Sequence, residues 1–330
     1  MTTQPELPEI PVIDVGPSFA LDTAQQVGER AYDLLSLATA RVPDSLLRLL
    51  DLASKRWLER NASPYLSEIA HLAGLSRLPG VYYINVHYEW GCTTAARSDA
   101  PGQSPILQRT LDWDVAGIGR YVLAARIAGP FGGWINLTWP GFTGVIQAMA
   151  PGRFAAAINQ PMPRRLSGVM TIDKLLALRD VWRSPHIQPV HLLRRVFETA
   201  VNYGAAKEML ATVAITTPAI FTLAGVRPHE ACVIERRPVE ARILETTLAA
   251  NDWRTPEWRP RHHLAYQNEA RLRAMELASP AWDPELRWVN WPLLNKQTRL
   301  ALMADPAKGR LLARGYEKER PATRTLRLEI

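Results

Sequence analysis

The residue in this sequence best suited to covalent chemistry is Cys92, a lone cysteine that follows a glycine. It opens a run of small and β-branched residues that reads Cys92-Thr93-Thr94-Ala95-Ala96. A cysteine becomes a strong nucleophile when its thiol loses a proton, and a nearby cation favours that loss. The ordinary alternative is a small buried residue on a strand, because cysteine is among the most buried residue types. We interpret Cys92 as a nucleophile.

A β-hairpin would bring a cation to this thiol. Residues 106–111 form a second strand-like run, and a stretch rich in Asp, Pro and Gly separates it from Cys92. Folding the chain about the middle of that stretch predicts Arg109 across from Cys92 and Asp112 across from Glu89. Arg109 would then favour the thiolate, and Asp112 would lie beside the peptide bond that enters Cys92. An ordinary ion pair at the end of a hairpin is the alternative.

Other catalytic signatures are missing from the sequence. It contains no Gly-x-Ser-x-Gly, His-Glu-x-x-His, Walker-type phosphate loop or Gly-x-Gly-x-x-Gly. Of the seven histidines, His262 and His263 are adjacent and the others are scattered, so the sequence does not assign a Cys–His pair. His87 is nearest to Cys92 along the chain. We expect no cofactor and no metal ion.

The composition is that of a soluble globular enzyme. The chain has 330 residues, of which 47% are hydrophobic and 22% charged. Two cysteines, Cys92 and Cys232, are too few for a disulfide framework, which favours a reducing compartment. The N-terminus lacks signal-peptide features, and no apolar run approaches ~18 residues. We therefore expect a cytoplasmic location, and we expect Cys232 to be a core residue.

The net charge of +7 is unevenly distributed. Residues 1–91 contain 7 Lys/Arg and 11 Asp/Glu, so the remainder of the chain carries the positive excess. The two parts should attract each other. A basic surface can also meet nucleic acid, but there is no zinc-ligand spacing, aromatic RNA-binding signature or dense Lys/Arg run. We expect no nucleic-acid partner.

The periodicity of apolar residues places these motifs in an α+β fold. A Pro-rich lead-in over residues 1–20 precedes three helices, which begin near Thr23, Pro43 and Ser63. Short apolar runs typical of strands follow at residues 121–128, 134–139, 144–149 and 154–158, and helical spacing returns over residues 172–210. Further strands are expected at residues 219–224, 231–235 and 241–248, then a helix at residues 268–278 and a last hairpin at residues 299–313. This order suggests two sheets between helical layers.

At this point the motifs resemble a known family. Cys92-Thr93-Thr94 followed by Arg109-Thr110-Leu111-Asp112 is similar to the start of the mature subunit in acid ceramidase and N-acylethanolamine-hydrolysing acid amidase, which reads Cys-Thr-Ser and then Arg-Asn-x-Asp. Further similar segments follow in the family's order, at residues 141–144, 218–225, 231–236, 251–253 and 292–295. The resemblance covers about residues 82–316.

The resemblance implies an N-terminal-nucleophile hydrolase with a four-layer αββα sandwich. Such a chain cuts itself before the cysteine, here between Gly91 and Cys92. Residues 1–91 would then be a helical N-terminal segment, either a subunit or a propeptide, and residues 92–330 the hydrolase domain. Glycine suits the cut site because it tolerates strained backbone conformations.

The resemblance also implies the roles of individual residues. The freed α-amino group, with a reference pKa of ~7.7–8.0, would take the thiol proton, so no histidine is required. Asp112 would hold this amine and Arg109 would set the charge around the thiol. Asn251 would donate a hydrogen bond to the oxyanion, and Arg271 would brace the site.

Three departures from the family pattern leave questions open. Thr110 stands where the family has asparagine, and Asn251 lacks the following tyrosine. The distal arginine lies in a run that differs from the family's, so Arg273 is an alternative to Arg271.

The implied function is hydrolysis of N-acyl amides of fatty-acyl or ceramide-like type through a thioester on Cys92. Acyl transfer through the same thioester, or a non-catalytic acyl-binding protein of the same fold, are the alternatives. The implied partners are a lipid-like small-molecule substrate and a membrane surface that the protein contacts peripherally. The two processed fragments are also expected to associate with each other. Trp253 and Trp258 begin an aromatic, basic stretch that we interpret as the mouth of the site, with a solvated loop as the alternative.

Overall fold

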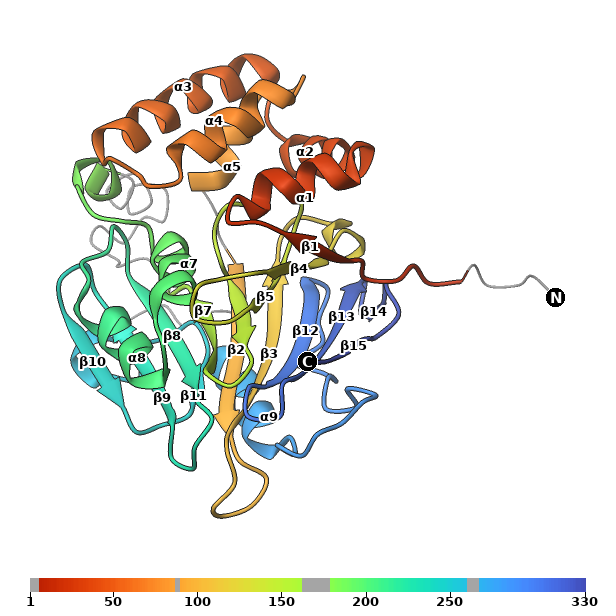
Figure 1. Cartoon of the computed structure of the whole chain (residues 1–330), viewed down its shortest axis with the longest axis vertical. Coiled ribbons are helices and arrows are strands. Elements are labelled where there is room, and N and C mark those ends of the chain that lie inside the picture. Colours follow the sequence, from red (N-terminus) through yellow and green to blue (C-terminus); the bar gives the residue numbers. More distant parts are fainter. Residues whose placement is uncertain (1–5, 87–89, 162–178, 260–266) are drawn as a thin grey trace.

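The computed structural model describes residues 6–86, 90–161, 179–259 and 267–330 (Figure 1). His87, Glu89, His262 and His263 lie outside these ranges, as does most of the first helix expected after residue 172. The expected pairing of Asp112 with Glu89 can therefore be judged only from the neighbouring strand residues.

Two β-sheets form the centre of the fold. The first has eight strands in the order β1-β4-β5-β6-β7-β8-β9-β10. Its members are β1 (Val12–Val15), β4 (Leu123–Ile127), β5 (Trp134–Thr138), β6 (Gln147–Ala150), β7 (Phe154–Asn159), β8 (Ala219–Ala224), β9 (Ala231–Arg236) and β10 (Ala241–Leu244). The second has the order β11-β2-β3-β12-β13-β14, with β15 also paired to β13. Its members are β11 (Leu248–Ala249), β2 (Trp90–Arg97), β3 (Ile106–Trp113), β12 (Thr298–Asp305), β13 (Arg310–Glu317), β14 (Arg320–Pro321) and β15 (Leu326–Glu329).

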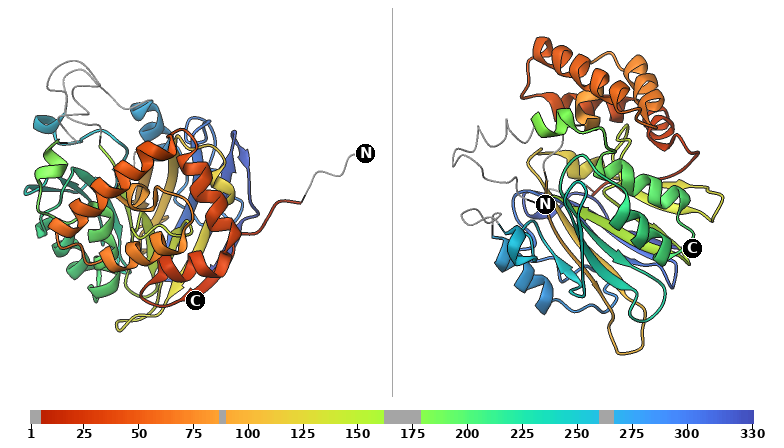
Figure 2. Two further views of the ribbon diagram at one scale, coloured as in Figure 1. Left: turned by 90° about the horizontal axis from the view of Figure 1, so that it is seen from above. Right: turned by 90° about the vertical axis from the view of Figure 1, so that its left-hand side faces the viewer.

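The two sheets pack face to face between helices. Strand β2 contacts β7 and β8 of the other sheet. Helices α7 (Pro189–Thr199) and α8 (Tyr203–Thr212) cover the eight-stranded sheet, whereas α9 (Asn268–Leu277) packs on β2 and β11 (Figure 2). Central strands such as β7, β8 and β12 are buried along their whole length, because each has a neighbouring layer on both faces. The predicted αββα architecture is confirmed.

The N-terminal helices form a cap at one end of the sheets. They are α1 (Phe19–Val27), α2 (Glu29–Thr39), α3 (Asp44–Arg60), α4 (Leu66–Leu75) and α5 (Val81–Val86), and the last three lie together at the top of Figure 1. The single helix expected from Thr23 onward is wrong, because Gly28 adopts a φ of 46° and separates α1 from α2. Within the described residues, no helix is both long and apolar enough to cross a membrane.

The Pro-rich lead-in contains a strand that the sequence pattern did not predict. Strand β1 pairs in parallel with β4, with Val12 beside Ala124. The first 91 residues therefore supply an edge strand to a sheet that otherwise belongs to the rest of the chain. The division at residue 91 stays a prediction about covalent processing.

The strand expected over residues 241–248 is two strands in different sheets. Strand β10 continues the eight-stranded sheet, where Ile243 pairs with Ile234. Strand β11 joins the other sheet, where Leu248 pairs with Ala95. The chain thus crosses between the sheets here and delivers Asn251 to the start of β2.

Candidate active site

The β2–β3 hairpin forms as predicted, but its register differs. Cys92 pairs with Leu111, Arg109 pairs with Thr94, and Asp112 pairs with Gly91. The predicted pairing of Cys92 with Arg109 is therefore wrong, and so is that of Asp112 with Glu89. Because alternate residues of a strand share a face, Arg109 still lies on the same face as Cys92, one diagonal step away.

The Cys92 sulfur lies between the two sheets, against a guanidinium group. Arg109 Nη2 is 2.8 Å from Cys92 Sγ and also donates to the Ile158 carbonyl at 2.8 Å. Arg109 Nη1 donates to Asn159 Oδ1 at 3.1 Å. Both Cys92 and Arg109 are fully buried. Residues of β7 therefore fix the cation in position beside the thiol.

Burial dominates the acid–base properties of this thiol. It raises the pKa of Cys92 to about 12, against the opposing effects of Arg109 and Arg271, while the Asp112 carboxylate adds to the increase. The thiol of the uncut chain is therefore protonated at neutral pH.

The backbone nitrogen of Cys92 is held by a side chain rather than by a strand neighbour. It donates to Asn251 Oδ1 at 2.9 Å. Asn251 Nδ2 in turn donates to the carbonyl of Gln160 at 2.6 Å and to that of Trp90 at 3.4 Å. Asn251 thus lies beside the peptide bond that joins Gly91 to Cys92.

Arg271 connects the remaining residues of the site. Its Nη1 donates to the Cys92 carbonyl at 3.0 Å and forms an ion pair with Asp112 at 3.3 Å. Its Nη2 donates to Asn251 Oδ1 at 3.0 Å. Arg273, the alternative from sequence, is exposed. Arg271 is therefore the arginine of α9 that lies at the site.

Asp112 is a buried carboxylate with several donors. Besides Arg271, it accepts hydrogen bonds from Thr298 Oγ1 at 2.8 Å and Asn295 Nδ2 at 3.1 Å. Burial raises the pKa of Asp112 above its ordinary value, and Arg271 partly offsets that effect. A Cβ on Gly91 would lie 3.4 Å from the Asp112 Cβ, so the carboxylate is next to the predicted cut site.

The structure brings all five predicted site residues together, and it adds others that sequence reasoning missed. Asn159 holds Arg109, and Asn268 accepts hydrogen bonds from the backbone nitrogens of Asn251 and Asp252 at 2.8 and 3.2 Å. Asn159 could have been noticed in the sequence, because it ends the apolar run of β7 and a buried amide needs hydrogen-bond partners. Their catalytic roles stay predictions.

The interpretation of residues 253–263 as the mouth of the site is wrong for its two tryptophans, while residues 260–263 lie outside the described ranges. Each tryptophan is only 6% exposed, and their rings pack edge to face with centroids 5.2 Å apart. They form a small apolar cluster with Ile220 and Val233. These tryptophans therefore support the fold and do not present a lipid-contacting surface.

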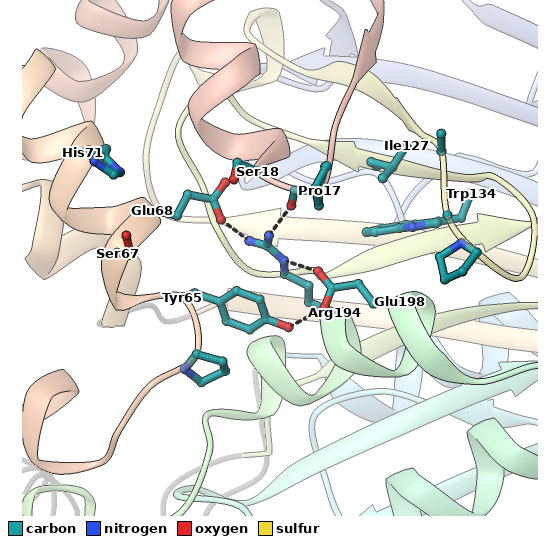
Figure 3. Close-up of a pocket in the computed structure, with 14 residues that line it drawn as sticks. Pro17, Ser18, Tyr65, Ser67, Glu68, His71, Ile127, Trp134, Arg194 and Glu198 are labelled. Carbon is teal, nitrogen blue, oxygen red and sulfur yellow. Dashed lines mark hydrogen bonds and ion pairs between the residues drawn. The ribbon is translucent and has the colours of Figure 1, made fainter.

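A separate pocket of about 450 Å³ lies where the N-terminal cap meets the eight-stranded sheet (Figure 3). Cys92 is not among the residues that line it. Its buried Arg194 forms ion pairs with Glu68 at 2.6 Å and Glu198 at 2.8 Å. The Arg194 guanidinium also stacks over the Tyr65 ring at 3.9 Å. Opposite charges from the two parts of the chain thus meet at this junction.

The chain is similar to acid ceramidases in sequence, although no family model matches it. Acid ceramidase from Heterocephalus glaber is 28% identical over 100 residues, which are 30% of this chain and 24% of that protein. A probable acid ceramidase from Caenorhabditis elegans is 24% identical over 212 residues, which are 58% of this chain and 52% of that protein. The chain spans about half, or less, of the length of these curated relatives.

Solved structures of amide hydrolases are also similar. The Caenorhabditis elegans N-acylethanolamine-hydrolyzing acid amidase ortholog is 18% identical, with a TM-score of 0.49 over 66% of this chain and 93% of that chain. Penicillin V acylase from Agrobacterium tumefaciens is 10% identical, with a TM-score of 0.43 over 72% of this chain and 86% of that chain. The sequence matches confirm the resemblance to the acid ceramidase family that the motifs around Cys92 indicate.

Proposed function

We propose that this chain is a self-processing cysteine amidohydrolase that cleaves N-acyl amides with a lipid-like acyl group. One observation carries the proposal: Arg109 Nη2 lies 2.8 Å from Cys92 Sγ while Asn251 Oδ1 lies 2.9 Å from Cys92 N. The nucleophile and the nitrogen that would become its base thus each have a dedicated polar partner. The names of the curated and structural relatives, ceramidase and acid amidase, support the amide class.

In the proposed processing step, Cys92 Sγ attacks the Gly91 carbonyl carbon. The bond from that carbon to Cys92 N breaks, and the nitrogen takes up the thiol proton, so the product is a thioester beside a free amine. Water then hydrolyses the thioester to the Gly91 carboxylic acid and the Cys92 thiol. Arg109 stabilises the negative charge that develops on sulfur as the thiol gives up its proton.

In the proposed catalytic step, the freed α-amine of Cys92 takes the thiol proton and returns one to the leaving amine of the substrate. Asp112 is buried and pairs with Gly91, so it is positioned to bind the ammonium form. Asn251 Nδ2 loses its Trp90 carbonyl partner when the N-terminal segment withdraws. That donor then becomes free for the oxyanion, where one donor contributes roughly 3 kcal/mol to lowering the barrier.

Mass measurement of the purified full chain tests the processing step. We expect two fragments that divide between Gly91 and Cys92, and a single uncut chain for Cys92→Ala. Cys232→Ala is the matched control because Cys232 is also buried on a strand, where its thiol interacts with Tyr203 rather than with an arginine. It should be processed like the wild type. A wild-type chain that stays whole contradicts the proposal.

A panel of N-acyl amides tests the catalytic step. Processed protein is incubated with N-acyl ethanolamines, sphingoid amides, acyl amino acids and penicillin V, and both liberated amine and free acid are measured. Equal amounts of amine and acid indicate hydrolysis, whereas amine in excess over acid indicates acyl transfer. Processed protein that releases no amine and shows no acylation of Cys92 would support the non-catalytic alternative.

The two fragments are proposed to stay together after cleavage. Arg194 and Glu198 lie in the larger fragment, whereas Glu68 and Tyr65 lie in the smaller one, and side chains of all four interact with one another. Co-elution of both fragments on size exclusion is the expected result.

A further inference from the structure

The thioester of the processing step has the same bonds as the acyl-enzyme of the catalytic step. In both, a carbonyl carbon is joined to Cys92 Sγ, and water later cleaves the carbon–sulfur bond to give an acid and a thiol. During processing, the acyl group on sulfur is the N-terminal segment itself, which ends in Trp90-Gly91. The surroundings of Trp90 in the uncut chain therefore describe a place that an acyl group occupies.

The Trp90 side chain fills an aromatic site in the uncut chain. Trp90 and Cys92 lie on the same face of β2, and Trp90 is only 6% exposed. Its ring packs edge to face on Trp113, with centroids 5.6 Å apart, and Trp113 packs in the same way on Trp139 at 5.4 Å. A buried tryptophan covers ~150–250 Å² of surface, so withdrawal of Trp90 would uncover an apolar area of about this size beside the sulfur.

A polar group fixes the chain that leads to this aromatic site. Gln160 Oε1 accepts a hydrogen bond from Trp90 N at 3.2 Å. An acyl group that carries an amide N–H at the same position would restore this bond, whereas a plain alkyl chain would leave the glutamine oxygen without that donor.

The N-terminal segment is anchored just before this point. Asn85 on α5 accepts a hydrogen bond from Thr143 N at 2.8 Å and donates to the Gly141 carbonyl at 3.2 Å. These bonds join the two fragments independently of the cut peptide bond. Trp90 can therefore leave its site while these bonds hold α5 in place.

We propose that the site filled by Trp90 becomes the acyl-binding site after cleavage, and that it selects acyl groups ending in an aromatic ring. The ring of Trp90 is about five atoms from the Gly91 carbonyl carbon, which sets the preferred spacing. This proposal rests on the proposed amide hydrolysis and narrows its lipid-like acyl group to chains that end in an aromatic ring.

Amides of one fluorogenic amine with different acyl groups test the preference. N-acetyl-Trp-Gly and N-acetyl-Leu-Gly share the internal amides and differ in the ring, whereas 6-phenylhexanoyl and decanoyl differ in the ring alone without those amides. We expect kcat/KM to be roughly 10-fold or more higher for the aromatic member of each pair, from ring packing on Trp113. Equal values within each pair would overturn the proposal.

Substitution of Trp113 tests whether this residue causes the preference for aromatic acyl groups. Trp113→Leu should reduce the aromatic-to-aliphatic ratio of kcat/KM to within about 3-fold, whereas Trp113→Phe should retain much of it. Trp282→Leu is the control, because Trp282 is a half-buried tryptophan in the separate apolar cluster that also contains Met275 of α9. It should leave the ratio unchanged. A ratio that survives Trp113→Leu would place the acyl group elsewhere.

Failure of the proposed function is distinguishable from failure of this inference. A chain that stays uncut contradicts both. If the chain is processed but hydrolyses no amide, protection of Cys92 from iodoacetamide is measured instead. N-acetyl-Trp-Gly acid should then protect at roughly 10-fold lower concentration than N-acetyl-Leu-Gly acid, and equal protection would overturn the inference while processing stands.

Discussion

Replacement of Arg109 with methionine should slow self-cleavage before Cys92 by roughly 10- to 150-fold. The variant keeps an unbranched apolar side chain in the buried space and removes the cation that lies 2.8 Å from Cys92 Sγ. A hydrogen bond from a charged donor contributes about 1.5–3 kcal/mol, and each 1.36 kcal/mol of barrier is a factor of ten in rate. The loss should appear in the rate because the Cys92 thiol must give up its proton to attack, and the guanidinium stabilises the thiolate that results.

The same substitution should also lower stability, so rate and folding have to be measured separately. Ile158 O and Asn159 Oδ1 both lose their Arg109 donor. A buried acceptor left without a partner costs about 1–3 kcal/mol, which lowers the free energy of unfolding by roughly 2–6 kcal/mol in total. Urea unfolding of a Cys92→Ala background gives this value without interference from cleavage.

The assay is a time course of intact mass on freshly purified, folded protein. Arg97→Met is the matched control, because Arg97 is on the same strand as Cys92 and donates to the carbonyls of Met275 and Ala278 instead of to sulfur. It should lose stability and keep the wild-type cleavage rate. A folded Arg109→Met protein that is cleaved within about 2-fold of the wild-type rate would refute a role for the cation.

Three further outcomes follow from the same geometry. Arg271→Met leaves the Asp112 carboxylate buried without its counter-ion, so the free energy of unfolding should fall by about 3–5 kcal/mol in urea titration, while Arg273→Met at an exposed site should change it little. Gly91→Ala should fold and still be cleaved, as read by intact mass, because the nearest heavy atom to the new Cβ lies at 3.4 Å. Burial lowers the pKa of His191 from 6.5 to about 3, so the free energy of unfolding is highest above pH 6.5 and falls by about 1.4 kcal/mol for each pH unit below it. The urea midpoint should therefore be lower at pH 5 than at pH 7, and this difference should be smaller in His191→Gln.

The sequence was sufficient for the local part of the site. A turn-rich stretch between two apolar runs predicts a hairpin, and strand alternation then places Arg109 near Cys92 even though the assumed register is wrong. The register was wrong because the assumed midpoint of the hairpin, between Ala100 and Pro101, lies one residue before the observed midpoint, between Pro101 and Gly102. Asn251 and Arg271 were predicted from family resemblance, not from spacing.

Contacts that depend on packing between layers could not be predicted from the sequence. Asn159 reaches Arg109 only because β7 faces β3 across the interface between the sheets. Strand β1 pairs with a segment more than a hundred residues away, and nothing in its Pro-rich surroundings indicates a partner. The burial of Trp253 is a further case, since an aromatic and basic stretch reads the same whether it folds inward or outward.

The length of one strand explains why a side chain, and not a strand carbonyl, accepts the hydrogen bond from the Cys92 nitrogen. Strand β11 contains only Leu248 and Ala249, which pair with Ala95 and Thr94 and stop short of Cys92. An interior strand nitrogen ordinarily bonds a neighbouring carbonyl, but here the Asn251 side chain takes that place at 2.9 Å. A side-chain oxygen can follow a nitrogen that changes from amide to amine, whereas a ladder carbonyl is fixed by its own strand. The early end of β11 therefore provides a nitrogen that stays bonded in the uncut chain and can remain bonded to the same partner once it is free.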